Sequence, residues 1–275
     1  MTATTTSLRG TLLTRLTPPV LLAGRRADRV VERNLLVYRH SWMIIFSGFF
    51  EPLFYLWSIG LGIGSLVGEV TYGGRTLDYV EFVAPGLLAS AAMNGAVYES
   101  TMNVFYKLKH VKAYDAILAT PLGIADVTLG EITFSLMRGA AYGVAFCIVA
   151  TVMGLFLSPW AVLAVPAAVL IGFAFAAVGM ASTSYMRSWN DIELVQLAIL
   201  PLFLFSATFY PLDTYPRWLQ LVVQCTPLYQ GVALMRGLTT GVLAWSMVLN
   251  ACYLLAMGWI GVTVATRKLG RLLLP

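Results

Sequence analysis

Residues 160–184 read WAVLAVPAAVLIGFAFAAVGMASTS, a stretch that contains no charged side chain. The hydrocarbon layer of a bilayer is about 30 Å thick, and about 20 helical residues cross it. The stretch therefore predicts a membrane-spanning helix. Because its apolar residues run on without the alternation of barrel strands, we expect helices rather than a β-barrel.

The composition of the whole chain supports the same class of protein. Of the 275 residues, 59% are hydrophobic and 11% are charged, and the mean hydropathy is +0.78. A soluble domain is about 45–50% apolar and about 25% charged. These proportions exclude a cytosolic enzyme, a disordered chain and a secreted disulfide scaffold, and they predict an all-α integral membrane protein.

Working outward from residues 160–184, the hydropathy predicts six spans and two longer connections. The connection 106–131 contains a short amphipathic helix that ends near Pro121. The connection 207–240 is apolar but interrupted by prolines, which predicts a re-entrant helical hairpin at about 211–240. The six-helix domain covers residues 42–266, with spans at about 42–67, 82–105, 132–157, 160–184, 192–210 and 242–266.

The segments that flank this domain are polar and basic. Residues 1–20 are expected to form a mobile tail, and residues 21–40 an amphipathic helix along the membrane interface. Residues 267–275 are expected to form a basic tail. With the N-terminus inside, fourteen of the eighteen Lys and Arg residues fall in cytoplasmic segments and three in external ones. This asymmetry predicts that both termini are cytoplasmic and that the basic segments contact lipid headgroups rather than nucleic acid.

The chain lacks the usual motifs of catalysis. It contains no Walker A, HExxH or GxSxG sequence, and its three cysteines show no CxxC spacing. We therefore expect no catalytic residues, no bound metal and no nucleotide hydrolysis by this chain itself.

Three ionisable residues are expected inside the spans, at a similar depth in the inner half of the membrane: Glu51, Glu99 and Arg138. A charge at such a depth costs at least about 2–3 kcal/mol unless it is paired or hydrated. The three could line a polar substrate path, with Pro52 kinking the first span beside Glu51. They could equally form an internal Glu–Arg pair, or hold protonated carboxyls within the bundle.

Aromatic side chains crowd the outer end of the fifth expected span. Two interpretations stay open: anchoring at the headgroups, or lining the exit path of an amphiphile. The residues are Phe203, Phe205, Phe209 and Tyr210.

The order of these elements resembles the ABC-2 family of ATP-binding-cassette transporter permeases. Within it, the chain is similar to the NodJ subfamily of nodulation-type lipo-oligosaccharide exporters, with daunorubicin-type drug permeases as near relatives. Many of these permeases carry a histidine where this chain has Gln230. The stretches that carry the resemblance are EPLFYLWSIGLGIGSLVG (51–68), YVEFVAPGLLASAAMNGAVYES (79–100), YDAILATPLGIADVTLGEI (114–132), FLFSATFYPLDTYPRWLQ (203–220) and PLYQGVALMRGLTTG (227–241).

The resemblance implies a pair of permeases, two copies or two related chains, in a bacterial cytoplasmic membrane. It also implies two separate ATPase subunits that bind the ATP and Mg²⁺, so no cofactor is expected in this chain. A coupling helix at about 109–121 would dock on the ATPase, with the interfacial helix as a second contact. The implied contact residues are Lys109, Tyr114, Asp115, Leu118, Thr120 and Pro121, together with Glu32 and Arg33.

We therefore expect the permease of an exporter that moves an amphiphile outward, such as a lipid-linked saccharide, a glycolipid or a hydrophobic drug. A proton-coupled secondary transporter that uses Glu51 and Glu99 as relays is the alternative, although no convincing inverted repeat is visible. A membrane-embedded transferase would lack a catalytic set.

Overall fold

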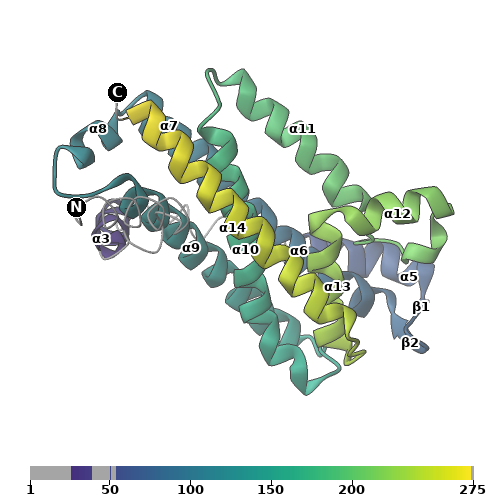
Figure 1. The fold of residues 1–275 in the computed structure, drawn as a ribbon. Helices are drawn as coiled ribbons and strands as arrows, with labels where there is room; N and C mark the ends of the chain where they lie inside the picture. Colours follow the sequence, from purple (N-terminus) through teal and green to yellow (C-terminus); the bar gives the residue numbers. More distant parts are fainter. Residues whose placement is uncertain (1–25, 39–49, 51–53, 274–275) are drawn as a thin grey trace, which may run out of the picture.

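The computed structural model describes residues 26–38, 50 and 54–273, and the regular secondary structure of this part consists of helices and one two-stranded hairpin (Figure 1). Four of its helices are long and apolar enough to cross a membrane. They are Tyr79–Lys109, Ile124–Val152, Pro159–Thr183 and Ser246–Leu273.

The core of the bundle is built around α10 (Ala164–Thr183), the helix that contains most of the apolar stretch 160–184. It packs against α6 (Tyr79–Tyr98), α9 (Ile124–Val152) and α14 (Ser246–Leu273). Small side chains such as Ala176 and Ala177 are fully buried on it, which lets the neighbouring helices approach closely. The expected span at 160–184 is thus an α-helix at the centre of the fold.

The second span is longer than expected and contains an irregularity. Helix α6 passes through a π-helical turn at Glu99–Asn103 and continues as α7 (Val104–Lys109). Lys109 therefore ends this helix and does not belong to the coupling helix. The short helix in the following connection is α8 (Ala113–Leu118).

The third span begins eight residues earlier than the hydropathy indicates, because Asp126 caps its first turn. The Gly123 N–H donates to Asp126 Oδ2 at 2.9 Å, and the Arg26 N–H donates to Asp126 Oδ1 at 3.3 Å. The second bond joins α9 to α3 (Ala27–Tyr38), the helix expected within residues 21–40. Glu131, expected in a connection, consequently lies on α9.

The sixth span also extends beyond its expected end. Helix α14 starts at Ser246 and continues to Leu273, so most of the stretch 267–275 is helical rather than a tail. The residues of the expected tail 1–20 lie outside the described part of the chain.

The first and fifth spans are described only in part or are shorter than expected. Residues 42–49 and 51–53 lie outside the described part; residues 54–67 are helical and end in α5 (Ser65–Val67). Helix α11 (Asn190–Phe205) has 16 residues, about 24 Å of helix, and stands apart from the bundle in Figure 1. Six membrane crossings therefore stay a prediction.

The connections at the opposite end from α8 hold the strands and two short helices. Strands β1 (Glu69–Tyr72) and β2 (Arg75–Asp78), which the sequence did not predict, form an antiparallel hairpin. Its two-residue turn is Gly73–Gly74, where both φ angles are positive (57° and 76°), as glycine allows. The short helices expected within 211–240 are α12 (Arg217–Cys225) and α13 (Pro227–Thr240).

The contact between α10 and α14 depends on Gly261. A Cβ atom at this position would lie 2.7 Å from the backbone carbon of Ala177. We expect Gly261→Ala to push the two helices apart and to lower the free energy of unfolding by about 1–3 kcal/mol. Thermal unfolding in detergent micelles measures this as a lower Tm.

The matched control for this prediction is Gly139→Ala on α9, where a new Cβ would meet no heavy atom within 4 Å. This substitution is expected to leave stability unchanged or to raise it by up to about 1 kcal/mol, because alanine is the better helix former. Equal melting temperatures for Gly261→Ala and the wild type would contradict the close packing.

Candidate functional site

The structure joins two of the three expected intramembrane charges in an ion pair. Arg138 Nη1 on α9 donates to Glu99 Oε2, and both side chains are largely buried. Asn103 Nδ2 donates to the same carboxylate oxygen at 2.7 Å, and Arg138 Nε donates to the Tyr142 hydroxyl at 2.9 Å. The pair agrees with the interpretation that the charges are satisfied inside the bundle. Glu51 and Pro52 lie outside the described residues.

The π-helical turn that carries Glu99 is held from the side by α10. Thr183 Oγ1 on α10 donates to the Ser100 carbonyl at 2.9 Å, and Gly179 leaves space for Ser100. A π-helical turn disrupts the regular backbone ladder and occurs frequently at functional sites. The Glu99–Arg138 pair therefore stands at an irregular point where α6, α9 and α10 meet.

The four aromatic residues expected at the outer end of the fifth span do not form one cluster. Phe203 meets Phe209 edge-on, with ring centroids 5.2 Å apart. The ring centroids of Phe203 and Tyr55 are 6.3 Å apart. Phe205 is exposed, and the centroid of its ring is 6.4 Å from that of Tyr215. Tyr210 is also exposed. Only Phe203 and Phe209 share a contact.

A buried arginine within the connection 207–240 organises this end of the molecule. Arg236 on α13 donates through Nε to the Phe82 carbonyl at 3.1 Å and through Nη2 to the Ala207 carbonyl at 2.9 Å. Its guanidinium also lies 3.8 Å from the centre of the Phe82 ring. Arg236 thus satisfies carbonyls at the break after α11, where Ala207 has a positive φ of 54°.

The expected ATPase contacts gather at the other end of the molecule, around α8 and α3. Asp115, Thr120 and Pro121 are exposed on or just after α8, and Leu118 is half-buried. Glu32 on α3 is exposed and accepts a hydrogen bond from Arg29 at 3.0 Å. Tyr114 differs from the rest because its side chain is completely buried, so it offers no surface to a docking partner in this structure.

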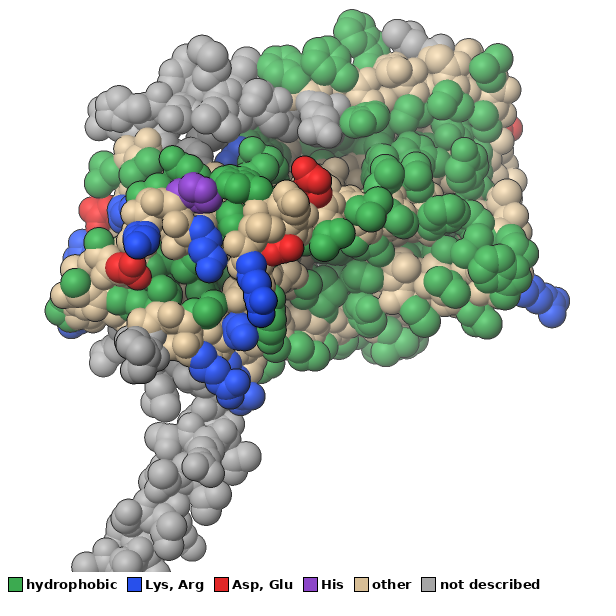
Figure 2. All heavy atoms as spheres, turned by 90° about the horizontal axis from the view of Figure 1, so that it is seen from above, with side chains coloured by type: hydrophobic (Ala, Val, Ile, Leu, Met, Phe, Trp, Pro, Cys, Tyr) green, Lys and Arg blue, Asp and Glu red, His purple; other side chains and the backbone are tan. Residues whose placement is uncertain are grey.

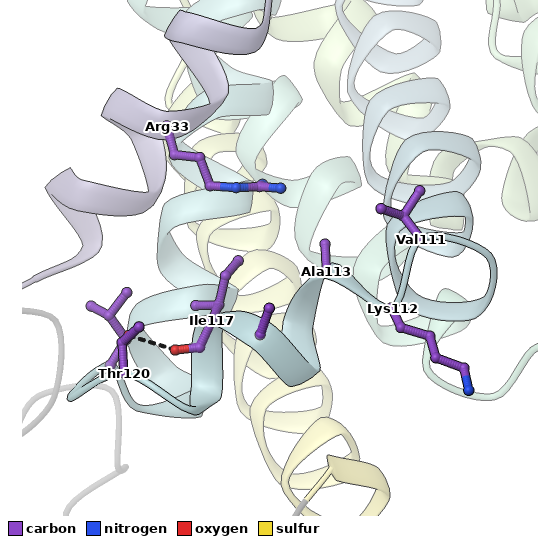
Figure 3. Close-up of a pocket in the computed structure, with 8 residues that line it drawn as sticks. Arg33, Val111, Lys112, Ala113, Ile117 and Thr120 are labelled. Atoms are coloured by element: carbon purple, nitrogen blue, oxygen red, sulfur yellow. Dashed lines mark hydrogen bonds between the residues drawn. The ribbon is translucent and has the colours of Figure 1, made fainter.

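A cavity of about 430 Å³ opens between α3 and α8 (Figure 3). Two of its lining side chains are cationic, none is acidic, and most of the others are apolar. The segment before α3 is joined to the segment after α8, because Arg26 Nη1 donates to the Pro121 carbonyl at 3.0 Å. The lining residues are Arg33, Val111, Lys112, Ala113, Ala116, Ile117, Thr120 and Leu122.

Behind this cavity lies a buried polar cluster that the sequence analysis missed. It consists of Asn34 on α3, Lys107 on α7 and Glu131 on α9. Lys107 Nζ lies 2.7 Å from Glu131 Oε2, and Asn34 Nδ2 donates to the same oxygen at 3.0 Å. Lys107 Nζ also donates to Asn34 Oδ1 at 3.3 Å. The available signal was Asn34, a polar residue at helical spacing among the apolar positions of residues 21–40.

The described residues show no arrangement suited to metal binding, since they contain no group of three or more His, Cys, Asp or Glu side chains placed to hold an ion. His110 accepts a hydrogen bond at Nε2 from Trp189 Nε1 at 3.1 Å. This bond joins the end of α7 to the connection before α11.

The Glu99–Arg138 pair generates a prediction about stability. Arg138→Met leaves the Glu99 carboxylate buried without its cation, and breaking such a pair costs about 3–5 kcal/mol. The double variant Glu99→Leu/Arg138→Met removes both charges and is expected to be more stable than Arg138→Met alone. Equilibrium unfolding in detergent micelles tests this order, and a double variant less stable than Arg138→Met would contradict it.

Comparison with known proteins places this arrangement in a family. The family model for the ABC-2 type transporter matches residues 29–240, a range that includes most of α3, all of α8 and α13, and the Glu99–Arg138 pair. Nodulation protein J of Rhizobium leguminosarum bv. trifolii is 31% identical over 216 residues, which cover 77% of this chain and 80% of the relative.

Two further relatives extend the likeness. Nodulation protein J of Rhizobium meliloti (strain 1021) is 28% identical over 216 residues, covering 77% of this chain and 80% of the relative. The inner membrane transport permease YadH of Escherichia coli (strain K12) is 25% identical over 172 residues, which cover 60% of this chain and 63% of the relative.

Permease domains of this family lack nucleotide-binding motifs and pair with ABC ATPase subunits, so the chain is not itself an enzyme. A multi-pass helical chain whose matched range contains α6, α9 and α10 of the bundle core and the helices near the cavity fits that role. The chain belongs to the ABC-2 type transporter family, as a membrane permease subunit similar to nodulation protein J.

Proposed function

We propose that this permease exports an amphiphile across the cytoplasmic membrane, driven by ATPase subunits that dock on α8 and α3. The observation that carries the proposal is the surface around the cavity, where Asp115, Thr120 and Pro121 are exposed beside the cationic pair Arg33 and Lys112. A short helix with an exposed face next to an open cavity is suited to receive a protruding partner segment.

The distribution of charge supports an orientation with both termini in the cytoplasm. Lys and Arg side chains gather at the end of the molecule that carries α3, α7, α8 and the end of α14, whereas hydrophobic side chains cover much of the remaining face (Figures 1 and 2). Cytoplasmic segments of membrane proteins carry an excess of Lys and Arg. In this orientation α12 and α13 form the external, re-entrant hairpin of a six-span domain.

Helix α11 supports assembly with a second permease, either another copy or a related chain. It exposes a row of leucines that includes Leu194, Leu197 and Leu200, and it stands apart from the bundle (Figure 1). Pairing through α11 and the neighbouring first and second spans would cover this row. Two ATPase subunits would then serve the two permeases, and relative movement of the permeases would alternate access to the path.

The substrate class is proposed from the relatives and from the aromatic contacts. Relatives named nodulation protein J support a lipid-linked saccharide or a glycolipid, and a hydrophobic drug is the remaining member of the class. Phe203, Phe209 and Tyr55 provide aromatic surface at the external end, while Phe205 and Tyr210 lie at its margin. The polar part of the path would involve Glu51 and Pro52 together with the Glu99–Arg138 pair.

The first experiment identifies the source of energy. The tagged permease is purified from its native membrane, any bound Walker-motif protein is identified, and the complex is placed in proteoliposomes. We expect ATP-dependent, vanadate-sensitive transport of a fluorescent acylated oligosaccharide. Transport that needs a proton gradient and no ATP would instead support the proton-coupled alternative.

The exposed residues on and just after α8 generate a second prediction. Asp115→Ala and Pro121→Ala alter the proposed docking surface, so the amount of substrate moved per ATP should fall by about fivefold or more, within the usual range of coupling between sites. The permease pair should stay assembled, as judged by size-exclusion chromatography with light scattering.

The control for these two variants is Glu69→Ala, which removes an exposed acid from β1 at the opposite end of the molecule. It should transport at the wild-type rate. Wild-type coupling in both α8 variants would show that α8 is not the docking helix.

A further inference from the structure

The buried polar cluster connects the proposed docking surface to two membrane spans. Arg33, which lines the cavity, donates through Nη1 to Asn34 Oδ1 at 3.3 Å. Asn34 and Lys107 both bind Glu131 Oε2, at 3.0 and 2.7 Å. Because Lys107 lies in the last turn of the second span and Glu131 lies in the first turns of α9, this cluster joins α3 to the cytoplasmic ends of both helices.

One oxygen of the cluster is left without a partner, and so is a hydroxyl on α8. Glu131 Oε1 and the Tyr114 hydroxyl are both buried, and neither has a partner among the described residues that meets the usual distance and angle of a hydrogen bond. Burial, followed by the charge of Glu131 and a hydrogen-bonding interaction with its side chain, raises the pKa of Tyr114 well above its ordinary value, so the two groups face each other. The hydroxyl therefore keeps its proton and can act as a donor.

Buried donors and acceptors are nearly always paired, and an unpaired one in a native structure calls for an explanation. Here a strong acceptor and a strong donor are left open together, on two elements that differ in how firmly they are held. Glu131 is fixed on a 29-residue helix by two hydrogen bonds. Tyr114 stands on the six-residue helix α8, which follows Lys112 in a left-handed conformation (φ 48°) and ends before Pro121.

We propose that Tyr114 and Glu131 are positioning residues that transmit movement of α8 to the second and third spans, through a hydrogen bond that closes when a partner presses on α8. In this arrangement the Tyr114 hydroxyl donates to Glu131 Oε1. Closing the bond completes the coordination of Glu131 and transfers the displacement of α8 to α9, and through Lys107 to α7. The present structure holds the open arrangement.

This inference rests on the proposed docking of an ATPase at α8, and it assigns Tyr114 a different role from the exposed residues beside it. Asp115, Thr120 and Pro121 would contact the partner directly. Tyr114, which is fully buried, would not touch the partner and would transmit the movement of α8 inside the permease. Loss of its hydroxyl should then spare docking and affect only the movement that docking causes in the spans.

The test is Tyr114→Phe in the complete permease–ATPase complex, since this change removes the hydroxyl and keeps the ring. We expect ATPase binding and ATP hydrolysis close to wild type, and a Tm that is unchanged or higher because an unpaired buried hydroxyl is gone. Transport of a fluorescent acylated oligosaccharide per ATP hydrolysed should fall by about fivefold or more. A wild-type ratio, or loss of ATPase binding, would overturn the inference.

A double-variant cycle with Glu131→Gln assigns the effect to this contact. If the two side chains act through one hydrogen bond, Tyr114→Phe should add nothing to the coupling defect of Glu131→Gln. Independent, multiplying defects would overturn the assignment. Failure of the wild-type complex to bind an ATPase is a separate result, because it refutes the proposed function before Tyr114 is tested.

The control variant is Ser135→Ala, which removes another buried hydroxyl one turn along α9. That hydroxyl donates to the Glu131 carbonyl of its own helix at 3.0 Å, so its hydrogen bond does not involve α8. We expect the ratio of transport to ATP hydrolysis to remain at the wild-type value. A defect equal to that of Tyr114→Phe would mean that any loss of a buried hydroxyl near Glu131 disturbs coupling, which would also overturn the inference.

Discussion

The structure depends on one constraint: a polar group inside an apolar bundle must find its partner within the protein. The few charges that enter this fold are held in that way. Arg138 pairs with Glu99, Lys107 pairs with Glu131, and Arg236 binds main-chain carbonyls. Each arrangement joins helices that are distant in sequence, because an unpaired charge in hydrocarbon is costly. These polar contacts determine which helices are tied to each other, while the apolar packing around α10 determines how close they lie.

The three polar arrangements stand at different levels of the molecule and tie different elements. The Lys107–Glu131 cluster joins α3, α7 and α9 near α8, the Glu99–Arg138 pair joins the π-helical turn to α9, and Arg236 joins α13 to α6 and to the break after α11. A displacement of α8 would act on the Lys107–Glu131 cluster before it affected the other two arrangements. The bundle thus has a polar connection at each level through which movement at one end can affect the next.

Much of the fold was predictable because the apolar stretches are long and the charges are few. The sequence predicted helices at 160–184, at 82–105, within 21–40 and after Pro211, and the structure has helices at each of these places. It predicted the start of α9 wrongly, since hydropathy does not register the capping of Gly123 by Asp126. The β1–β2 hairpin was missed because its strands have only four residues each.

By itself the sequence determined the membrane class, the family resemblance and the small set of ionisable residues that needed partners. Only the tertiary structure determined which residues are the partners of these ionisable groups. Glu99 meets Arg138 across 39 positions of the chain, and Glu131 meets Asn34 across 97. No local pattern encodes such pairings, because they arise from how the helices pack and from the cost of leaving a buried charge alone. The same packing buried Tyr114 while it left Asp115 exposed on the adjacent position of one short helix.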